Sequence, residues 1–179
     1  SVELLAASLH GMLTNPSTPW FSLRFKENDM ENQDEAKEWL EDATETMYAA
    51  FNRSNFQQEI FELYHDLITF GTAAMFIEED EEDILKFSTR HINEVYIAEN
   101  DKGRIDTVFR KFKLSARAAI QKFGANADFE VIANKDPYEE IDIIHAIYPR
   151  SDFNPKKQDK SNMPFESVYM TAKGEELSV

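Results

Sequence analysis

The spacing of apolar residues changes at Gly71, and this change constrains the fold more than any other feature of the sequence. Before Gly71, apolar residues recur at every third or fourth position, which is the period of an amphipathic helix. After Gly71, they alternate with polar residues, which is the period of a β-strand. The sequence therefore predicts an α+β fold, in which long helices come first and an antiparallel sheet with short helices follows.

The first predicted helix, residues 2 to 13, is followed by a stiff connecting segment, residues 16 to 21, which we call the join. The leucines of the helix are interleaved with alanine, serine and glycine, a pattern typical of a helix that packs closely on a neighbour. Pro16 and Pro19 end it, and the chain restarts at Trp20 with the alternating segment "WFSLRF", which predicts a strand. We interpret Trp20 and Phe21 as core residues that fix the angle of this join, with an interface role as the alternative.

Two longer helices are predicted next. The first covers residues 33 to 53, and the second begins at a cap on Ser54 or Asn55 and ends at Gly71. The acidic residues that would complement the dipole of the first of these helices are Glu31, Asp34 and Glu35. The apolar stripe that we assign to the core on the same helix contains Trp39, Met47 and Phe51.

The remaining chain predicts a meander of strands with two short helices. The predicted strands are residues 72 to 80, 84 to 90, 94 to 100, 105 to 113, 140 to 150 and 165 to 172. The turn at residues 100 to 103 ends in Gly103, which can take a positive φ in a hairpin. The predicted short helices are residues 115 to 124, with Ser115 as the cap, and residues 127 to 137, and a basic-leaning loop covers residues 151 to 164.

Composition sets further limits. The chain has 179 residues, with few glycines and prolines and no linker-like tract, so we expect residues 1 to 179 to form a single domain. Because it has no cysteine, disulfide scaffolds and thiolate metal sites are excluded. No apolar run is long enough for a membrane span. The first residue is Ser1, so we expect a processed or trimmed piece of a longer product.

The sequence contains no complete catalytic motif, so we predict neither catalytic residues nor a cofactor. The five glycines lie too far apart for a phosphate-binding loop. The four histidines are scattered, and His145 fits a core position beside isoleucines better than a metal site. The acidic run from Glu78 to Asp83 lacks the ligand spacing of a calcium loop. An acidic metal-dependent hydrolase or other metal-binding module, using this run with His91, is the alternative.

Several segments together resemble the head-to-tail connecting (portal) proteins of podovirus-like tailed phages. The resemblance covers nearly the whole chain in the family's order, except residues 125 to 162, where only "HAIYPR" matches. The segments that carry it are "AASLHGMLTNPSTPWFSLRF", "NFQQEIFELYHDLITFGTAAMFIEED", "LKFSTRHINEVYIAENDKGRIDTVFRKFKLSARAAIQKFG" and "PFESVYM".

The resemblance implies a non-enzymatic ring subunit, usually one of a dodecamer, at the portal vertex of the virion. A terminase would drive DNA through the ring, and capsid or scaffold proteins and a tail adaptor would be further partners; assembly would take place in the host cytoplasm, without a membrane. This chain would be the N-terminal, wing-type part, and its join would set the angle of a packed unit. The net charge of −15 suits a wall past which DNA slides without specific binding. The residues that we expect to shape packing or subunit contacts are Gly11, Pro16, Pro19, Trp20, Phe21, Gly71 and Gly103, and the acids that we expect to face the channel are Glu78, Glu79 and Asp80.

Overall fold

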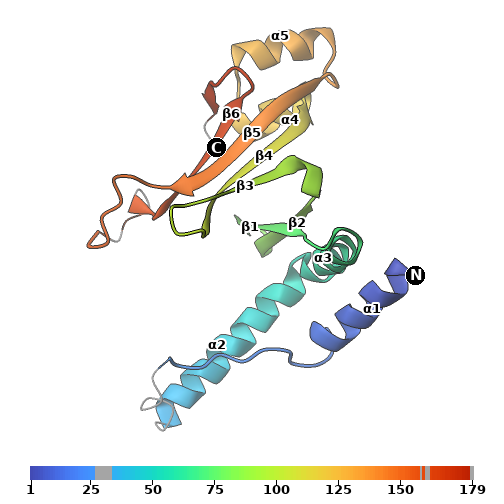
Figure 1. Ribbon diagram of the computed structural model, residues 1–179, viewed down its shortest axis with the longest axis vertical. Coiled ribbons are helices and arrows are strands. Elements are labelled where there is room, and N and C mark those ends of the chain that lie inside the picture. Colours follow the sequence, from blue (N-terminus) through green and yellow to red (C-terminus); the bar gives the residue numbers. More distant parts are fainter. Residues whose placement is uncertain (27–33, 158, 160–161, 178–179) are drawn as a thin grey trace. The chain divides into compact units, whose positions relative to one another are not determined.

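The structure is a computed structural model that describes residues 1–26, 34–157, 159 and 162–177 (Figure 1). Contacts within the chain divide it into two units, Ser1–Ile92 (unit 1) and Asn93–Val179 (unit 2). Unit 1 contains three helices and a β-hairpin, and unit 2 contains an antiparallel sheet with two α-helices in its described part. The predicted α+β class is confirmed. That the 179 residues act as a single domain stays a prediction.

Unit 1 is built around aromatic residues from α3 and the hairpin. Its elements are α1 (Val2–Leu13), α2 (Asp34–Arg53), α3 (Phe56–Phe70), β1 (Ala74–Asp80) and β2 (Ile84–Arg90). Its buried core residues are Ala6, Phe56, Ile60, Tyr64 and Phe87. Because the fully buried contact on α1 is an alanine, α1 can approach α3 closely, as its small residues predict.

The predicted end of α3 at Gly71 is confirmed. Gly71 has a φ of 77°, and its backbone N–H donates to the carbonyl of Leu67 at 2.9 Å. We also expect a buried strand directly after Gly71, and this expectation is wrong. β1 is only half-buried, and Ile77 is 56% exposed, because β1 pairs with β2 alone in a two-stranded sheet.

Two glycine-to-alanine substitutions should change stability in opposite directions. Gly71→Ala should lower the free energy of unfolding by about 1 kcal/mol, because alanine at this positive φ is strained even though a Cβ would meet no atom within 4 Å. Gly11→Ala should raise it by roughly 0.5–1 kcal/mol, because Gly11 lies inside α1 with equally open space around it. Urea denaturation of both variants checks the prediction, and equal shifts of the same sign would contradict it.

Two expectations for α2 and the preceding segment are wrong. None of the twenty residues of α2, all within the described part of the chain, is buried, and Trp39 is 60% and Met47 39% exposed. Only Phe51 of the predicted stripe packs against the core. The segment "WFSLRF" is extended but forms no strand within the described residues, because side chains of α2 bind its backbone instead of a second strand. Asp34 and Glu35 lie in the first turn of α2, whereas Glu31 lies outside the described residues.

Unit 2 is an antiparallel meander. Its elements are β3 (Val95–Glu99), β4 (Ile105–Ser115), α4 (Ala116–Phe123), α5 (Ala127–Lys135), β5 (Glu140–Pro149), β6 (Phe165–Thr171) and β7 (Glu176–Leu177), and a 3-10 turn (Ile92–Glu94) precedes β3. The strand order is β3-β4-β5-β6-β7, while β1 and β2 form a separate sheet. The predicted strands are thus present, but they belong to two sheets. The two-residue strand β7 is too short to produce a period in the sequence.

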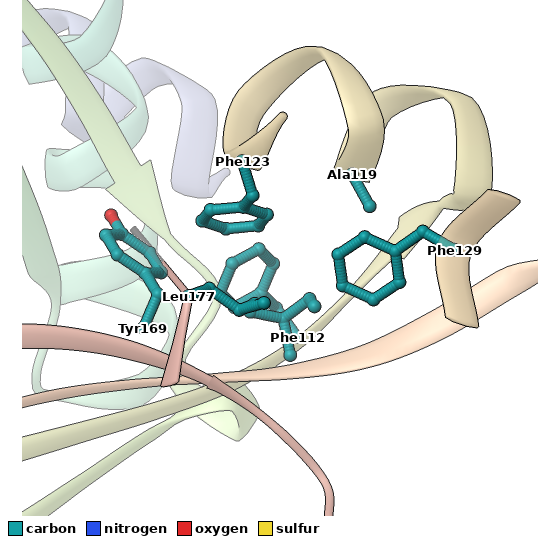
Figure 2. Close-up of a cluster of buried hydrophobic side chains, with 7 residues drawn as sticks. Phe112, Ala119, Phe123, Phe129, Tyr169 and Leu177 are labelled. Atoms are coloured by element: carbon teal, nitrogen blue, oxygen red, sulfur yellow. The ribbon is translucent and has the colours of Figure 1, made fainter. Parts of the chain in front are cut away.

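The core of unit 2 lies between the sheet and its short helices. Figure 2 shows its side chains pointing toward one another from β4, α4, α5, β6 and β7. The residues labelled there are Phe112, Ala119, Phe123, Phe129, Tyr169 and Leu177. The Ser115 hydroxyl accepts from the N–H of Ala118 and caps α4, as predicted. His145 is buried, stacks on Tyr169 and bonds the Ser167 hydroxyl, which agrees with its assignment to the core.

Candidate assembly site

The join between α1 and α2 begins with a polar anchor. α1 ends at Leu13, and the following Thr14 is buried with its hydroxyl 3.3 Å from the Tyr64 hydroxyl of α3. The side chain of Asn15 then accepts from the N–H of Ser17 at 2.8 Å, which forms a tight turn around Pro16. The chain therefore turns at the predicted proline break, while Thr14, just before the prolines, stays attached to the core.

The hydroxyl of Tyr48 holds the extended part of the join. It accepts from the N–H groups of Trp20 at 2.5 Å and Phe21 at 2.6 Å, and it donates to the carbonyl of Phe21 at 2.9 Å. One turn earlier on α2, the Thr44 hydroxyl accepts from the N–H of Leu23 at 3.3 Å. Tyr48 and Thr44 lie four residues apart, so they share a face of α2, and the segment is aligned along that face. These bonds could not be predicted from local sequence patterns, since their partners lie more than twenty residues apart.

Aromatic rings pack around Trp20 and Phe21 of the join. Trp20 stacks on Phe56 with ring centroids 5.6 Å apart and planes 7° apart, and Phe21 stacks on Tyr48 at 4.4 Å. Phe51 contacts both rings of the join, at 5.9 Å from Trp20 and 5.8 Å from Phe21. Trp20 and Phe21 are half-buried, so the join is both a part of the core of unit 1 and a part of its surface.

The loop between α2 and α3 anchors the hairpin strand β2. The side chain of Asn55 accepts from the N–H of Phe87 at 2.9 Å and donates to its carbonyl at 2.8 Å. The Glu59 carboxylate accepts from the N–H of Thr89 at 2.5 Å. Of the two predicted caps, Ser54 accepts from the first N–H of α3 at 3.2 Å, while the Asn55 side chain binds β2 and the Glu59 carboxylate rather than the backbone of α3. The sequence predicts a cap on Ser54 or Asn55, and it does not reveal that Asn55 has a partner 32 residues away.

An open groove lies beside the join. It has a volume of about 580 Å³ and is lined by the extended segment on one side and by α2 on the other. Its lining includes Pro19, Phe21, Arg24, Leu40, Glu41 and Glu45. Apolar side chains, two carboxylates and the cationic groups of Arg24 and Lys37 thus face the same open space, which suits a docked polypeptide better than a small reactive substrate.

The predicted acidic run forms the tip of the β1–β2 hairpin. Asp80 accepts from the N–H groups of Asp83 at 2.8 Å and Glu82 at 3.0 Å, and these bonds hold the pKa of Asp80 below its ordinary value. Glu78 lies 3.8 Å from the Lys86 ammonium on the facing strand. The carboxylate of Asp80 therefore stabilises a turn. Whether Glu78, Glu79 and Asp80 face a channel stays a prediction.

The structure does not bring the acidic run into a metal centre. In the described part of the chain, no group of three or more histidine, aspartate or glutamate residues is placed to hold a metal ion. His65 and His91 line a shallow groove of about 400 Å³ together with Glu62 and Asp66. No arrangement of described residues therefore favours the metal-dependent alternative.

The other predicted residues are spread over both units. Pro19, Trp20 and Phe21 come together at the join, while Gly11 lies on α1 and Gly71 at the end of α3. Gly103 belongs to unit 2, where its φ of 68° and the Asn100 side chain shape the β3–β4 turn as predicted. No described helix is both long and apolar enough to cross a membrane.

Comparison with known proteins gives matches along the whole chain. A family model described as "Bacteriophage head to tail connecting protein" matches residues 1–179. The portal protein of Salmonella phage epsilon15 is 31% identical over 177 residues, which cover 97% of this chain and 32% of that protein. The probable portal protein of Bordetella phage BPP-1 is 29% identical over 173 residues, covering 94% and 31%. The chain thus spans about a third of the length of these relatives, and the resemblance predicted from its sequence is confirmed.

Proposed function

Because the chain belongs to the family of bacteriophage head to tail connecting proteins, we propose that it is part of a structural, non-enzymatic subunit of the portal ring. The single observation that carries the proposal is the family match over residues 1–179. The ring, a dodecamer by family resemblance, would occupy one vertex of the virion. DNA would enter through it during packaging and leave through it during ejection.

Unit 1 has the internal rigidity that a subunit of such a ring would need. The Tyr48 hydroxyl, the Asn55 side chain and the aromatic cluster fix the join, α2 and β2 relative to one another. A subunit in a closed ring must hold one angle toward its neighbours, since an error at each interface accumulates around the circle. The join from Pro16 to Phe21 would supply this rigidity.

The proposed partners follow from the place of the ring. A terminase would engage it during packaging, capsid or scaffold proteins would surround it, and a tail adaptor would bind its outer end. Copies would assemble in the host cytoplasm and remain in the virion.

The acidic surface predicts weak binding to DNA. With a net charge of −15, the chain should not bind a DNA duplex tightly at physiological salt, because few phosphate counterions would be released. We expect no saturable binding at micromolar concentrations of the chain in fluorescence anisotropy. Micromolar affinity would contradict the proposal that DNA slides past this surface.

Disruption of the gene in its phage tests the proposed function. We expect capsids that contain no DNA, and their packaging should be restored by the intact gene supplied in trans. A gene copy that carries Glu79→Gln tests the hydrolase alternative, which uses the acidic run. A structural subunit should restore packaging with or without this carboxylate. DNA-filled capsids in the absence of the gene would overturn the proposal.

A further inference from the structure

We propose that the outer edge of β1 binds an extended segment of a partner protein, which adds a third strand to the two-stranded β1–β2 sheet through backbone hydrogen bonds. The segment would carry apolar residues where it faces Met75 and Ile77, and basic residues where it faces Glu79. This surface lies within unit 1 and does not depend on the proposed place of the chain in a ring.

The edge formed by β2 is closed by side chains of unit 1. The Asn55 side chain binds both the N–H and the carbonyl of Phe87. The Glu59 carboxylate accepts from the N–H of Thr89. At these positions β2 therefore has its hydrogen bonds without a third strand.

The edge formed by β1 is open. In an antiparallel pair, two residues that lie opposite each other either bond each other or both point their backbone groups outward. Phe87 points outward and lies opposite Ile77, so the N–H and carbonyl of Ile77 also point outward. By the same alternation, so do those of Met75 and Glu79. These three residues form no backbone hydrogen bond along this edge within the described part of the chain, which makes the edge a template for another strand.

The apolar face of the hairpin stops abruptly at β1. Ile77 and Phe87 are register partners, so their side chains point to the same face of the sheet. Phe87 is buried in the core, whereas Ile77 is 56% exposed. Met75 lies on this face as well and packs against the core. A strand added beside β1 would cover Ile77, and this position therefore favours apolar residues in the added segment.

The second half of β1 favours a basic partner. Its carboxylates are Glu78, Glu79 and Asp80. The cations on β2 are Lys86, which lies 3.8 Å from Glu78, and Arg90, which lies at the other end of the strand. Arg53 donates to a carbonyl of the turn. Glu79 forms no ion pair among the described residues, and an added strand would lie next to β1, where opposite charges on neighbouring strands attract.

Binding of short peptides to the whole protein tests the open edge. The probe is a labelled peptide in which lysines precede alternating valines and threonines, so that the lysines face Glu79 in an antiparallel pairing. Fluorescence anisotropy should show saturable binding. The same peptide with methyl groups on alternate backbone nitrogens keeps its charge but cannot complete the ladder, and it should bind at least about tenfold more weakly. Equal binding of the two peptides, or binding of neither, would overturn the inference.

Substitutions in β1 locate the binding site. Ile77→Pro removes the outward N–H at the centre of the edge, and it keeps the bonds between β1 and β2 because this N–H points away from β2. It should weaken binding of the lysine peptide at least about tenfold. Its matched control, Ile77→Thr, keeps the N–H and should leave the affinity within about threefold.

Glu79→Lys tests the sign of the charge. It should weaken binding of the lysine peptide by roughly threefold to tenfold and strengthen binding of a peptide with glutamates in place of the lysines. Unchanged affinities in both Ile77→Pro and Glu79→Lys would overturn the inference. If the proline variant does not fold, the methylated peptide with the unaltered protein still decides whether the edge forms a ladder.

Photo-cross-linking in phage particles identifies what covers the edge. With benzoylphenylalanine in place of Ile77, we expect links to a segment of a different protein in which basic residues accompany alternating apolar ones. Glu79 would then face a partner protein rather than the channel, so links to DNA would overturn the inference, as would links to a second copy or to another part of the same chain. Because peptide binding is measured without reference to ring assembly, its failure would leave the proposed function standing.

Discussion

Replacement of Phe87 by alanine should lower the free energy of unfolding of unit 1 by about 3–5 kcal/mol, the cost of a buried phenylalanine. The Phe87 side chain is 2% exposed, and its ring lies 5.1 Å from that of Phe56 and 5.7 Å from that of Phe51. Asn55 binds both backbone groups of Phe87, so β2 cannot move freely to fill the cavity. This substitution removes the ring through which the hairpin packs on the helices.

Tryptophan fluorescence during urea denaturation measures this loss. Both tryptophans, Trp20 and Trp39, lie in unit 1, so the signal reports the unfolding of that unit. Phe70→Ala is the matched control, because Phe70 is 50% exposed and should cost about 1 kcal/mol or less. Equal losses for the two variants would show that Phe87 does not occupy a packed core.

Tyr48→Phe should lower the free energy of unfolding of unit 1 by about 2 kcal/mol, although it removes one oxygen atom. The hydroxyl accepts from two backbone N–H groups and donates to one carbonyl of the join. Its loss leaves these groups without their partner in a half-buried place, and an unpaired buried polar group costs about 1–3 kcal/mol. Phenylalanine keeps the ring stacked on Phe21, so the change isolates the hydrogen bonds.

The same fluorescence measurement, with amide hydrogen exchange, tests the role of Tyr48. Exchange at Trp20 and Phe21 should become faster in the variant. Thr46→Ala is the control, because this exposed hydroxyl also lies on α2 in unit 1 and its bond, to the carbonyl of Asp42 at 2.9 Å, stays within the helix. If the midpoint of urea denaturation and the exchange at Trp20 and Phe21 were both unchanged, the Tyr48 hydroxyl would not hold the join.

The helices and strands could largely be predicted from the sequence because their signals are local. The third helix ends at Gly71 and the β3–β4 turn uses Gly103, since each position requires a positive φ that glycine adopts without strain. The strand from Ile84 to Arg90 has the predicted bounds. The division into two sheets could not be predicted, because periodicity does not reveal which strands pair.

The candidate site was predictable only in part. The prolines and aromatic residues marked Trp20 and Phe21 as unusual, but the alternation of "WFSLRF" indicated a strand. In the structure, Tyr48 and Thr44 satisfy that backbone from a helix, a pairing between distant residues that no local pattern contains. The expectation that Trp39 lies in the core is wrong because periodicity marks an apolar face and does not reveal whether another element covers it.

We propose that many copies of the protein close into a ring around a channel. Electron microscopy of the purified whole protein, with native mass spectrometry to count the subunits, tests whether this ring forms. We expect one closed ring with a central channel that admits a DNA duplex. Monomers at high protein concentration, or open filaments without closure, would contradict it.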